Sequence, residues 1–498
     1  MLDLETLQHH VMLGAKNVWS MLAYDPSAPM LFSSGLFWLL FILILPVYVA
    51  LKSSKSKMVF FIVLFSLYFY YKSSGLFFLM LIGTSWVDWL ISVRISHAAT
   101  PGHRKAWMWL SIILSLSVLG YFKYANFFLW NWNQMVHGNF QPLDVILPVG
   151  ISFYTFQSIS YVVDVYKERI RPTRLWIDYL FFLSFFPALV AGPIVRADYF
   201  LPQLEKNERA TPDMVWGGLW LIVIGIVKKA LIADYIAQYN DLIFNDPQLY
   251  TGVQTLMGVL GYTMQIYCDF SGYSDMAIGL ALIMGFRLGI NFNAPYQSRN
   301  LTEFWRRWHI SLSSWLRDYL YIPLGGNRKG TFRTYLNNFL TMLIGGLWHG
   351  AAWKFVFWGA MHGVGLAIHK ASLPVLKKIP DNFVTIFISW ALTFVYVSLL
   401  WVFFRAASFS DSILIIRNIF VDFQWNQIPQ FAEARPEWCV MMATLILFHF
   451  FPEKWGRGVE RFFVRSPWVI KLGVFIIAVQ LVIEFMTSEV APFIYFQF

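Results

Sequence analysis

The chain has 498 residues, of which 58% are apolar, 19% are aromatic and only 13% are charged, and its mean hydropathy is +0.54. Soluble domains carry about 25% charged residues, so this composition excludes an ordinary soluble protein and predicts a membrane protein. The net charge of +10 arises from Lys and Arg in short connections between apolar runs. It indicates contact with anionic membrane lipids and no nucleic-acid partner.

The first 30 residues are predicted to form an amphipathic helix on the membrane surface. They contain Asp3 and Glu5 where a secretory signal has basic residues. Their apolar residues, from Leu4 to Leu22, recur at helical spacing with polar residues between them. A disordered leader is the alternative.

Apolar runs then follow one another along the whole chain. Residues 35–51, 383–404 and 467–485 are each close to the length of about 20 residues that crosses a hydrocarbon core. We predict an all-α, polytopic transmembrane protein forming one membrane domain over 1–498, with roughly 11–14 membrane helices. The predicted spans are 35–51, 58–71, 75–93, 107–130, 145–164, 179–195, 214–235, 252–268, 275–290, 336–348, 353–369, 383–404, 438–451 and 468–485, the last three forming a C-terminal group over 383–498.

The charge of the connections predicts a topology. Basic connections face the cytoplasm in a bacterial inner (plasma) membrane, and the basic ones here are 52–57, 94–105, 167–174 and 454–465. The intervening connections 72–75 and 131–144 carry one Lys and none. This alternation places the N-terminus, connection 131–144 and the C-terminus outside the cytoplasm.

Several kinds of chemistry find no support in the sequence. Cys268 and Cys439 both lie inside apolar stretches, without disulfide or metal-ligand spacing. No Gly-rich phosphate loop and no G-x-S-x-G nucleophile motif occurs. We therefore expect no metal, no bound cofactor and no serine nucleophile within the chain.

Residues 265–350 differ from the apolar runs around them, because they carry ionisable and amide side chains at membrane depth. A charged side chain there costs at least about 2.5–3.5 kcal/mol, so it usually lines a cavity. Short segments broken by Gly or Pro are tolerated at that depth only where protein or a water-filled cavity covers them. This segment predicts re-entrant pieces around a thin central funnel, and the functional site lies in it.

His349 is the first candidate for catalysis. It follows Gly345, Gly346, Leu347 and Trp348 and precedes Gly350. A neutral imidazole away from bulk water can take the proton of an attacking hydroxyl, and glycines allow backbone or substrate to approach the ring. The alternative is a histidine that only hydrogen-bonds between helices.

His309 is the second candidate and follows the segment WRRW. The arginines and tryptophans of this segment fit a helix at the membrane interface. In the functional alternative, Arg306, Arg307 and Arg317 meet the phosphates or pantetheine arm of an acyl carrier. Asp269 and Asp275 orient a histidine, pair with an arginine or form a buried structural pair, and His362 and His369 are interpreted as packing residues. The predicted substrate-binding residues are Asp269, Asn291, Trp305, Arg306, Arg307, Trp308, Arg317, Asp318 and Trp348.

These segments resemble the membrane-bound O-acyltransferase family. The resemblance covers residues 148–363, the predicted catalytic core, through the runs 148–156 (PVGISFYTF), 191–196 (AGPIVR), 265–275, 304–327 and 341–350. Within the family, the motifs WRRWH and LRDYLYIPLGGNR, the length and the C-terminal PFIYFQF are more similar to the alginate-acetylating subgroup than to the teichoic-acid D-alanyl subgroup.

The resemblance implies a function. The family's characteristic histidine corresponds to His349, and its second polar or histidine position corresponds to His309. Members place a ring of helices around a thin centre, where a cytoplasmic thioester donor (acetyl-CoA or an acyl carrier thioester) and an acceptor from the other side meet. Alginate-type members pass acetyl to a periplasmic serine-hydrolase-like acetyltransferase partner, which modifies the exopolysaccharide. Transfer of D-alanyl or another acyl group to a cell-envelope polymer is one alternative. A transporter for a lipid-linked sugar is another, although no internal repeat is visible.

Overall fold

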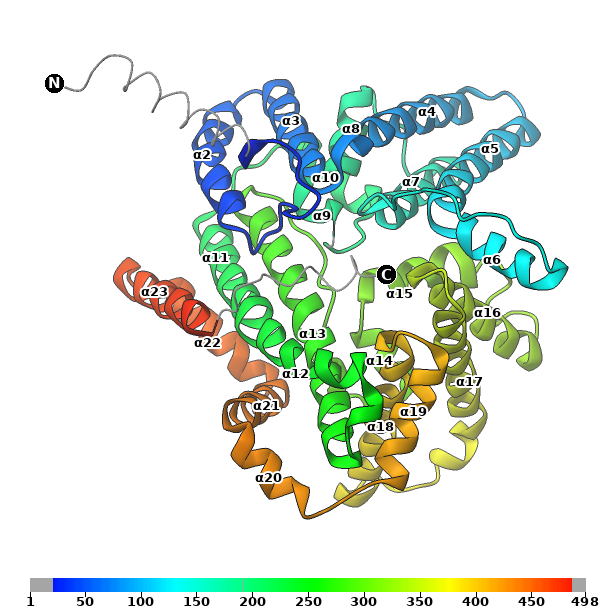
Figure 1. Ribbon diagram of the computed structural model, residues 1–498. Helices are drawn as coiled ribbons and strands as arrows, with labels where there is room; N and C mark the ends of the chain where they lie inside the picture. The colour runs from blue at the N-terminus through cyan, green and yellow to red at the C-terminus, as the bar shows by residue number, and fades with distance from the viewer. Residues whose placement is uncertain (1–20, 191, 486–498) are drawn as a thin grey trace, which may run out of the picture. The chain divides into compact units, whose positions relative to one another are not determined.

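The computed structural model describes residues 21–190 and 192–485 (Figure 1). Most of the predicted N-terminal amphipathic helix, residues 1–20, lies outside the described residues, as does the C-terminal PFIYFQF. Throughout the described part the regular elements are helices, without a strand, which confirms the predicted all-α class. Two compact units form: residues 1–122, 145–190 and 196–207 make the first, and residues 123–144, 191–195 and 208–498 make the second.

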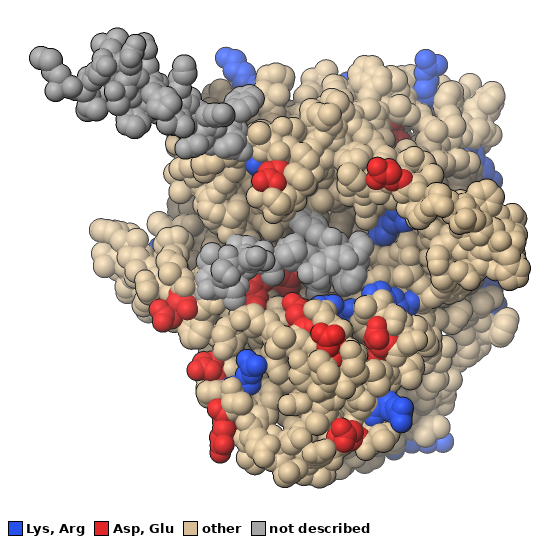
Figure 2. Space-filling model, in the orientation of Figure 1, with Lys and Arg blue, Asp and Glu red and all other residues tan. Residues whose placement is uncertain are grey.

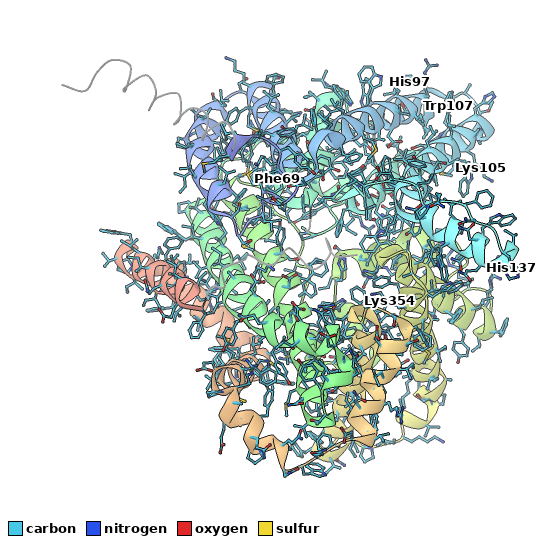
Figure 3. All side chains as sticks on the ribbon, viewed as in Figure 1. Phe69, His97, Lys105, Trp107, His137 and Lys354 are labelled. Carbon is cyan, nitrogen blue, oxygen red and sulfur yellow. The ribbon has the colours of Figure 1, made fainter. Side chains whose placement is uncertain are left out.

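The first unit is a helical bundle in which α3, α4, α5, α7 and α8 pack on one another. At its centre the Asp88 carboxylate is buried and accepts hydrogen bonds from the Ser111 hydroxyl, at 2.6 Å, and from the Ser158 hydroxyl. The predicted basic connection 94–105 comprises the last turn of α4, which ends at His97, a short link, and the beginning of α5, which contains Lys105 (Figure 3). The elements of this unit are α2 (Gly35–Leu51), α3 (Lys55–Ser74), η1 (Gly75–Phe77), α4 (Phe78–His97), α5 (Pro101–Leu119), α7 (Ile151–Tyr166), α8 (Trp176–Ser184), α9 (Phe186–Leu189) and α10 (Ala197–Lys206).

The second unit contains every candidate site residue. A π-helical turn, η2 (Gly120–Tyr124), leads into it from α5. Its elements are α6 (Ala125–Val136), α11 (Pro212–Ile226), η3 (Val227–Ala233), α12 (Asp234–Asn245), η4 (Pro247–Leu249), α13 (Gly252–Ile283), η5 (Pro295–Gln297), α14 (Leu301–Arg307), α15 (Ile310–Leu316), η6 (Arg317–Tyr321), α16 (Thr331–His349), α17 (Trp353–Leu376), α18 (Phe383–Arg405), α19 (Phe409–Val421), α20 (Gln427–Ala434), α21 (Pro436–His449), α22 (Glu453–Arg465) and α23 (Trp468–Phe485).

Several helices begin where the sequence offers a side-chain cap. The Thr211 hydroxyl accepts a hydrogen bond from the Met214 amide at the start of α11, and Pro212 occupies the first helical position. Asn382 and Ser408 form capping boxes before α18 and α19. These caps satisfy N–H groups that have no partner within the helix, so local chemistry fixes where the helices start.

The helices α11 and α13 approach each other through two pairs of glycines (Figure 1). A Cβ at Gly218 or Gly279 would lie 2.5–2.6 Å from the carbonyl oxygen of the other, and one at Gly225 or Gly272 would lie 2.5–2.7 Å from its counterpart. Real Cβ atoms do not approach so closely. Glycine at these four positions therefore sets the distance between the two backbones.

The helix α13 corrects two predictions. The spans predicted at 252–268 and 275–290 are largely one continuous helix, Gly252–Ile283. The polar residues between them do not break the helix, because lysines of η3 compensate their charges: Lys229 Nζ lies 2.6 Å from Asp269 and 2.7 Å from Asp234, and Lys228 Nζ lies 2.7 Å from Asp275. Lys228, Lys229 and Asp234 lie outside residues 265–350, so ionisable groups within the apolar part of the chain are not confined to that segment, contrary to the prediction.

The chain is a multi-pass membrane protein. In the described residues, five helical stretches are long and apolar enough to cross a membrane: Lys55–His97, Pro101–Val136, Pro212–Asn245, Phe383–Arg405 and Trp468–Phe485. Charged side chains are sparse on the face shown in Figure 2, and large apolar side chains such as Leu392 and Ile477 are exposed. The predicted number of spans and the central funnel stay predictions.

Candidate functional site

His349 is the last residue of α16, and two side chains hold the end of that helix. Lys123 Nζ donates hydrogen bonds to the carbonyl oxygens of Trp348, at 2.5 Å, and of His349, at 3.1 Å. Tyr124 Oη donates to the carbonyl of Leu347, at 2.9 Å. The last carbonyls of a helix lack partners within it, and a cation is stabilised beside them by the helix dipole. Lys123 and Tyr124 thus fix the backbone from which the imidazole projects.

The glycines around His349 allow close packing of α16 on α17. A Cβ at Gly346 would lie inside 3.0 Å of the Phe355 carbonyl oxygen and of the Gly359 Cα, and a Cβ at Gly350 would collide with the Phe355 ring. The His349 ring, 5% exposed, lies between aromatic rings, with centroid distances of 5.0 Å to Trp348, 5.1 Å to Trp358 and 5.3 Å to Phe404. The glycines predicted that backbone or substrate can approach the His349 ring closely. In the structure, backbone and aromatic side chains of the protein itself do so.

His309 is fully buried at a sharp turn between α14 and α15. Its backbone is left-handed, with φ of 44°, a conformation that costs most residues energy and that Asn, Asp and His adopt more readily. Its ring lies edge-on to Phe270, at a centroid distance of 4.6 Å. The turn therefore directs the imidazole into the core of the unit.

Asn291 fixes which nitrogen of His309 carries the proton. The Asn291 Oδ1 accepts hydrogen bonds from the Ser311 amide, at 3.2 Å, and the Ser311 hydroxyl, at 2.8 Å, while its Nδ2 donates to Ser274 Oγ, at 3.2 Å. An amide oxygen only accepts, so His309 Nδ1, 3.1 Å from it, must be the donor. In the neutral ring the lone pair then lies on Nε2, where it can accept a proton.

The rings of both candidate histidines lie near the Trp348 side chain. The Trp348 ring centroid is 6.2 Å from that of His309 and 5.0 Å from that of His349. The structure thus brings together His349, His309, Asn291 and Trp348, which come from α16, from the α14–α15 turn and from the segment after α13. An imidazole pair in a buried aromatic environment is an arrangement that suits general acid–base chemistry.

Replacing Asn291 with leucine is expected to reduce turnover more than it reduces folding. The change keeps the volume but removes the acceptor of His309 Nδ1–H, so the tautomer is no longer fixed. Leaving a buried donor unsatisfied costs about 1–3 kcal/mol, and about 1.4 kcal/mol in the barrier is a tenfold change in rate. We expect at least a tenfold loss of initial rate at saturating donor, measured beside the melting temperature. Asn418→Leu, which removes hydrogen bonds to the carbonyls of Pro247 and Tyr250, should lower only the melting temperature.

Replacing Lys123 with methionine is expected to lower both the melting temperature and the turnover number. The carbonyls of Trp348 and His349 would lose the Lys123 donor, while the Leu347 carbonyl would keep the Tyr124 hydroxyl, and the His349 backbone would gain freedom. Lys123→Arg should restore part of the rate because it restores charge and donors. Lys354→Met is the matched control, since the Nζ of Lys354, which Figure 3 labels, donates to the carbonyl of Ala406, at 2.7 Å, outside α16. Equal turnover in Lys123→Met and Lys354→Met would contradict this role.

A cavity of about 600 Å³ is lined by residues of α14, α15, η6, α16 and α17, the same group of elements that positions His309 and His349. The residues that line it include three cations, Arg306, Arg317 and Lys370, together with the indole of Trp305, and no carboxylate. Amide and hydroxyl groups of Asn327, Asn338, Thr302, Ser313, Ser314, Thr341 and Tyr321 complete its polar wall. Such a lining suits an anionic molecule with a polar stem.

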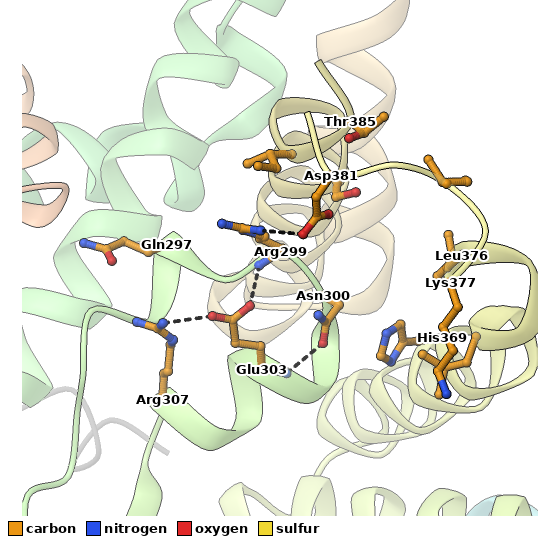
Figure 4. A pocket seen from close by; sticks show the side chains of 14 residues that line it. Gln297, Arg299, Asn300, Glu303, Arg307, His369, Leu376, Lys377, Asp381 and Thr385 are labelled. Carbon is orange, nitrogen blue, oxygen red and sulfur yellow. Dashed lines mark hydrogen bonds and ion pairs between the residues drawn. The ribbon is translucent and has the colours of Figure 1, made fainter. Parts of the chain in front are cut away.

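Arg307 does not line this cavity, whereas Arg306 and Arg317, the other two arginines of the acyl-carrier alternative, do. Arg307 lines a second cavity, of about 610 Å³, on a different side of α14 (Figure 4). There Arg307 pairs with Glu303 at 2.9 Å, and Arg299 lies 3.7 Å from Asp381. Carboxylates already balance the charge of this second cavity, so it offers less to an anion.

Trp308, Asp269 and Arg317 make packing contacts or charge pairs in the structure. Trp308 is 1% exposed, stacks on Phe304 and contacts Trp401, so its assignment to a membrane-interface belt is wrong. Asp269 pairs with Lys229, as in the structural alternative. Arg317 forms a two-pronged pair with Asp318, at 2.6 and 3.1 Å, on the rim of the 600 Å³ cavity.

The model of the membrane-bound O-acyltransferase family matches residues 106–410. The chain is 46% identical to a probable alginate O-acetylase AlgI of Pseudomonas putida, over 76% of this chain and 77% of the relative. It is 38% identical to a peptidoglycan O-acetyltransferase of Helicobacter pylori (72% and 73%) and 30% identical to a teichoic acid D-alanyltransferase of Bacillus subtilis (54% and 71%).

The chain belongs to the membrane-bound O-acyltransferase family. This membership confirms the resemblance and the prediction of an acyltransferase, because a single family model covers the whole predicted catalytic core and every residue that lines the cavity. The roles of the individual residues of this O-acyltransferase stay predictions that rest on the geometry above.

Sequence reasoning missed three residues of this O-acyltransferase. Lys123, Trp358 and His362 all adjoin His349 or its neighbours. Lys123 carried a signal that was available: it is a lysine inside an apolar stretch, and such residues usually have a function. His362 had been interpreted as packing; its Nδ1 accepts a hydrogen bond from Trp305 Nε1, at 3.3 Å, so it connects the cavity wall to the site.

Proposed function

We propose that this protein transfers acetyl from a cytoplasmic thioester across the bacterial inner membrane towards an exopolysaccharide of the alginate type, through a periplasmic acetyltransferase partner. The observation that carries the proposal is the pair of buried imidazoles, His309 and His349, on one tryptophan beside a cationic cavity. Similarity to the AlgI proteins and to a peptidoglycan O-acetyltransferase supports acetyl as the group transferred.

In this mechanism His349 acts as the general base. The acceptor hydroxyl oxygen attacks the thioester carbonyl carbon, and the imidazole takes the hydroxyl proton. The tetrahedral intermediate then collapses, the C–S bond breaks, and the departing thiolate takes the proton back, so the ring returns to its neutral form. Positioning both reactants beside one base is worth several kcal/mol of barrier, within the roughly 7–11 kcal/mol that ideal orientation supplies.

The 600 Å³ cavity is proposed as the donor site. Acetyl-CoA and an acyl carrier protein present the same thioester on a phosphopantetheine arm, and Arg306 and Lys370 suit its phosphate, while Arg317 pairs with Asp318 at the rim. The donor is a substrate that leaves as a thiol, so the chain needs no resident cofactor. The Trp305 indole forms the part of the cavity wall that contacts His362, to which it donates a hydrogen bond. His362 therefore lies on the side of the cavity that faces His349.

The acceptor polymer has a second candidate. The similarity to the peptidoglycan O-acetyltransferase of Helicobacter pylori covers nearly as much of the chain as that to the AlgI proteins. Peptidoglycan is therefore the alternative acceptor, with the same donor, base and cavity.

Mass spectrometry of the exported polymer and of peptidoglycan, from cells with and without the gene, tests the proposal. We expect loss of O-acetyl esters from the exopolysaccharide alone, and restoration by the wild-type gene. Loss from peptidoglycan alone would select the alternative acceptor. Unchanged ester content in both polymers would reject acetyl transfer by this chain. Deletion of the partner acetyltransferase gene should give the same unacetylated exopolysaccharide, while the membrane protein still accumulates.

A further inference from the structure

Two buried N–H groups next to His349 have no hydrogen-bond acceptor among the residues that the structure describes. They are Nε1 of Trp358 and Nε2 of His362. Both side chains are almost completely inaccessible, at 1% and 0% exposure. A buried polar group without a partner is costly, and native proteins retain few of them. Two side by side at a reaction centre suggest that an acceptor is supplied by another molecule.

The hydrogen bond from Trp305 determines that His362 Nε2 is a donor. An indole N–H can only donate, so His362 Nδ1, 3.3 Å from Trp305 Nε1, must be the acceptor. The neutral ring then carries its proton on Nε2. His362 therefore presents an N–H, and Trp358, whose indole nitrogen is a donor only, presents another.

The two donors lie on one face of α17. Trp358 and His362 are four residues apart on the helix, a spacing that places side chains one above the other. Their ring centroids are 4.6 Å apart. Two hydrogen bonds of about 2.9 Å each can bridge donors up to roughly 6 Å apart through one oxygen, a reach that exceeds the centroid spacing of these two rings.

The two donors lie close to the proposed base and to the proposed donor cavity. The Trp358 ring is 5.1 Å from the His349 ring between centroids. The His362 ring is 5.0 Å from that of Trp305, which lines the 600 Å³ cavity. The donors thus lie between the proposed base and the proposed donor cavity, where the carbon of the thioester carbonyl has to be placed.

We propose that Trp358 Nε1 and His362 Nε2 together bind the carbonyl oxygen of the acyl group that is transferred. This proposal rests on the acyl transfer proposed above. When the hydroxyl oxygen bonds to the carbonyl carbon, the C=O electron pair moves onto the oxygen, and the two N–H groups stabilise that oxyanion. When the C–S bond breaks, the pair returns and the carbonyl reforms. Donors aimed at a developing oxyanion lower the barrier more than they strengthen substrate binding.

Trp358→Phe and His362→Met each remove one donor and test the proposal in the purified full-length protein. Loss of one oxyanion donor typically costs about 10²–10³ in turnover number, and we expect at least a tenfold fall in transfer rate with little change in KM for acetyl-CoA. His362→Gln, whose side-chain amide can donate from the position of Nε2, should recover part of the rate. Trp401→Phe is the matched control, because this equally buried indole already donates to Tyr296 Oη, at 3.2 Å.

Infrared difference spectra with acetyl-CoA labelled with ¹³C at the acetyl carbonyl provide a readout that is independent of turnover. The bound carbonyl band should lie at lower wavenumber than the free band in the wild-type protein, in His349→Ala and in Trp401→Phe. In Trp358→Phe and His362→Met it should move back towards the free position. A wild-type band at the free position, or the same band in all variants, would overturn the proposal, as would wild-type turnover in both donor variants.

These results separate the proposal from the function on which it rests. A shifted band without any acetyl transfer by the wild-type protein would retain the carbonyl site and reject the proposed function. Transfer that depends on His349 but is insensitive to Trp358 and His362 would retain the function and reject the carbonyl site.

Discussion

The His349→Ala protein is expected to insert and accumulate at normal levels but to transfer no measurable acetyl. The substitution removes the imidazole proposed as the base, while the backbone carbonyl that Lys123 binds remains. The rate should fall by at least about 10²-fold, the lower range of what a positioned general base contributes. The measurement is the ester content of the exported polymer, by mass spectrometry, together with the amount of protein in the membrane.

The control for this prediction is His369→Ala. His369 lies on α17, bonds Thr302 Oγ1 through Nδ1 at 2.9 Å and lines the second cavity, so its loss should leave acetylation nearly unchanged. A normally acetylated polymer from cells whose only copy carries His349→Ala would remove His349 from the mechanism. Loss of acetylation in both variants would instead indicate a general defect of α16 and α17.

Gly359→Val is expected to prevent accumulation of folded protein. A Cβ at Gly359 would lie inside 3.0 Å of the Met342 carbonyl oxygen and 3.0 Å from the Gly346 Cα, both on α16. Backbone atoms of a neighbouring helix cannot rotate away, so α16 and α17 must separate. Overpacking a close contact costs about 1–3 kcal/mol or more, and here the cost falls on the helix that ends in His349. Size-exclusion chromatography of the detergent-solubilised protein is the measurement.

The comparison for Gly359→Val is the same substitution at Gly456 of α22. A Cβ at Gly456 meets nothing within 4 Å, so valine there carries only its small helix-propensity difference from glycine. A monodisperse, acetylating Gly359→Val protein would show that α16 and α17 do not need this contact. Aggregation of both variants would point to a general intolerance of valine in these helices.

Patterns within single segments predicted the class of the fold and the location of the site. Apolar runs identified helices such as α18 and α23 nearly to the residue, since length and hydropathy are local properties. The glycines before His349 predicted a close approach, and α17 makes it. Local chemistry was sufficient for these features.

Features that depend on a distant partner could not be predicted. The sequence around Asp269 suggested a break in α13 because a lone carboxylate is costly at that depth. Lys229, 40 positions earlier in the chain, removes that cost. The tautomer of His309 depends in the same way on Asn291, and that of His362 on Trp305. Nothing in one segment reveals such partners.

Helix geometry alone distinguishes Arg306 from Arg307. The functional alternative for the arginines placed both of them, together with Arg317, at one acyl carrier. Successive residues on an α-helix point about 100° apart, so neighbours on a short helix such as α14 tend to face different surroundings. The two arginines accordingly line different cavities.

The left-handed backbone at His309 has a consequence for mutational scanning of this turn. Side chains branched at Cβ are strongly disfavoured at φ of 44°, so valine or isoleucine there would disrupt the chain reversal as well as delete the ring. Asparagine adopts this conformation readily and lacks an imidazole. The difference in activity between the His309→Asn and His309→Val variants therefore separates loss of the ring from loss of the bend. An alanine scan measures both losses together.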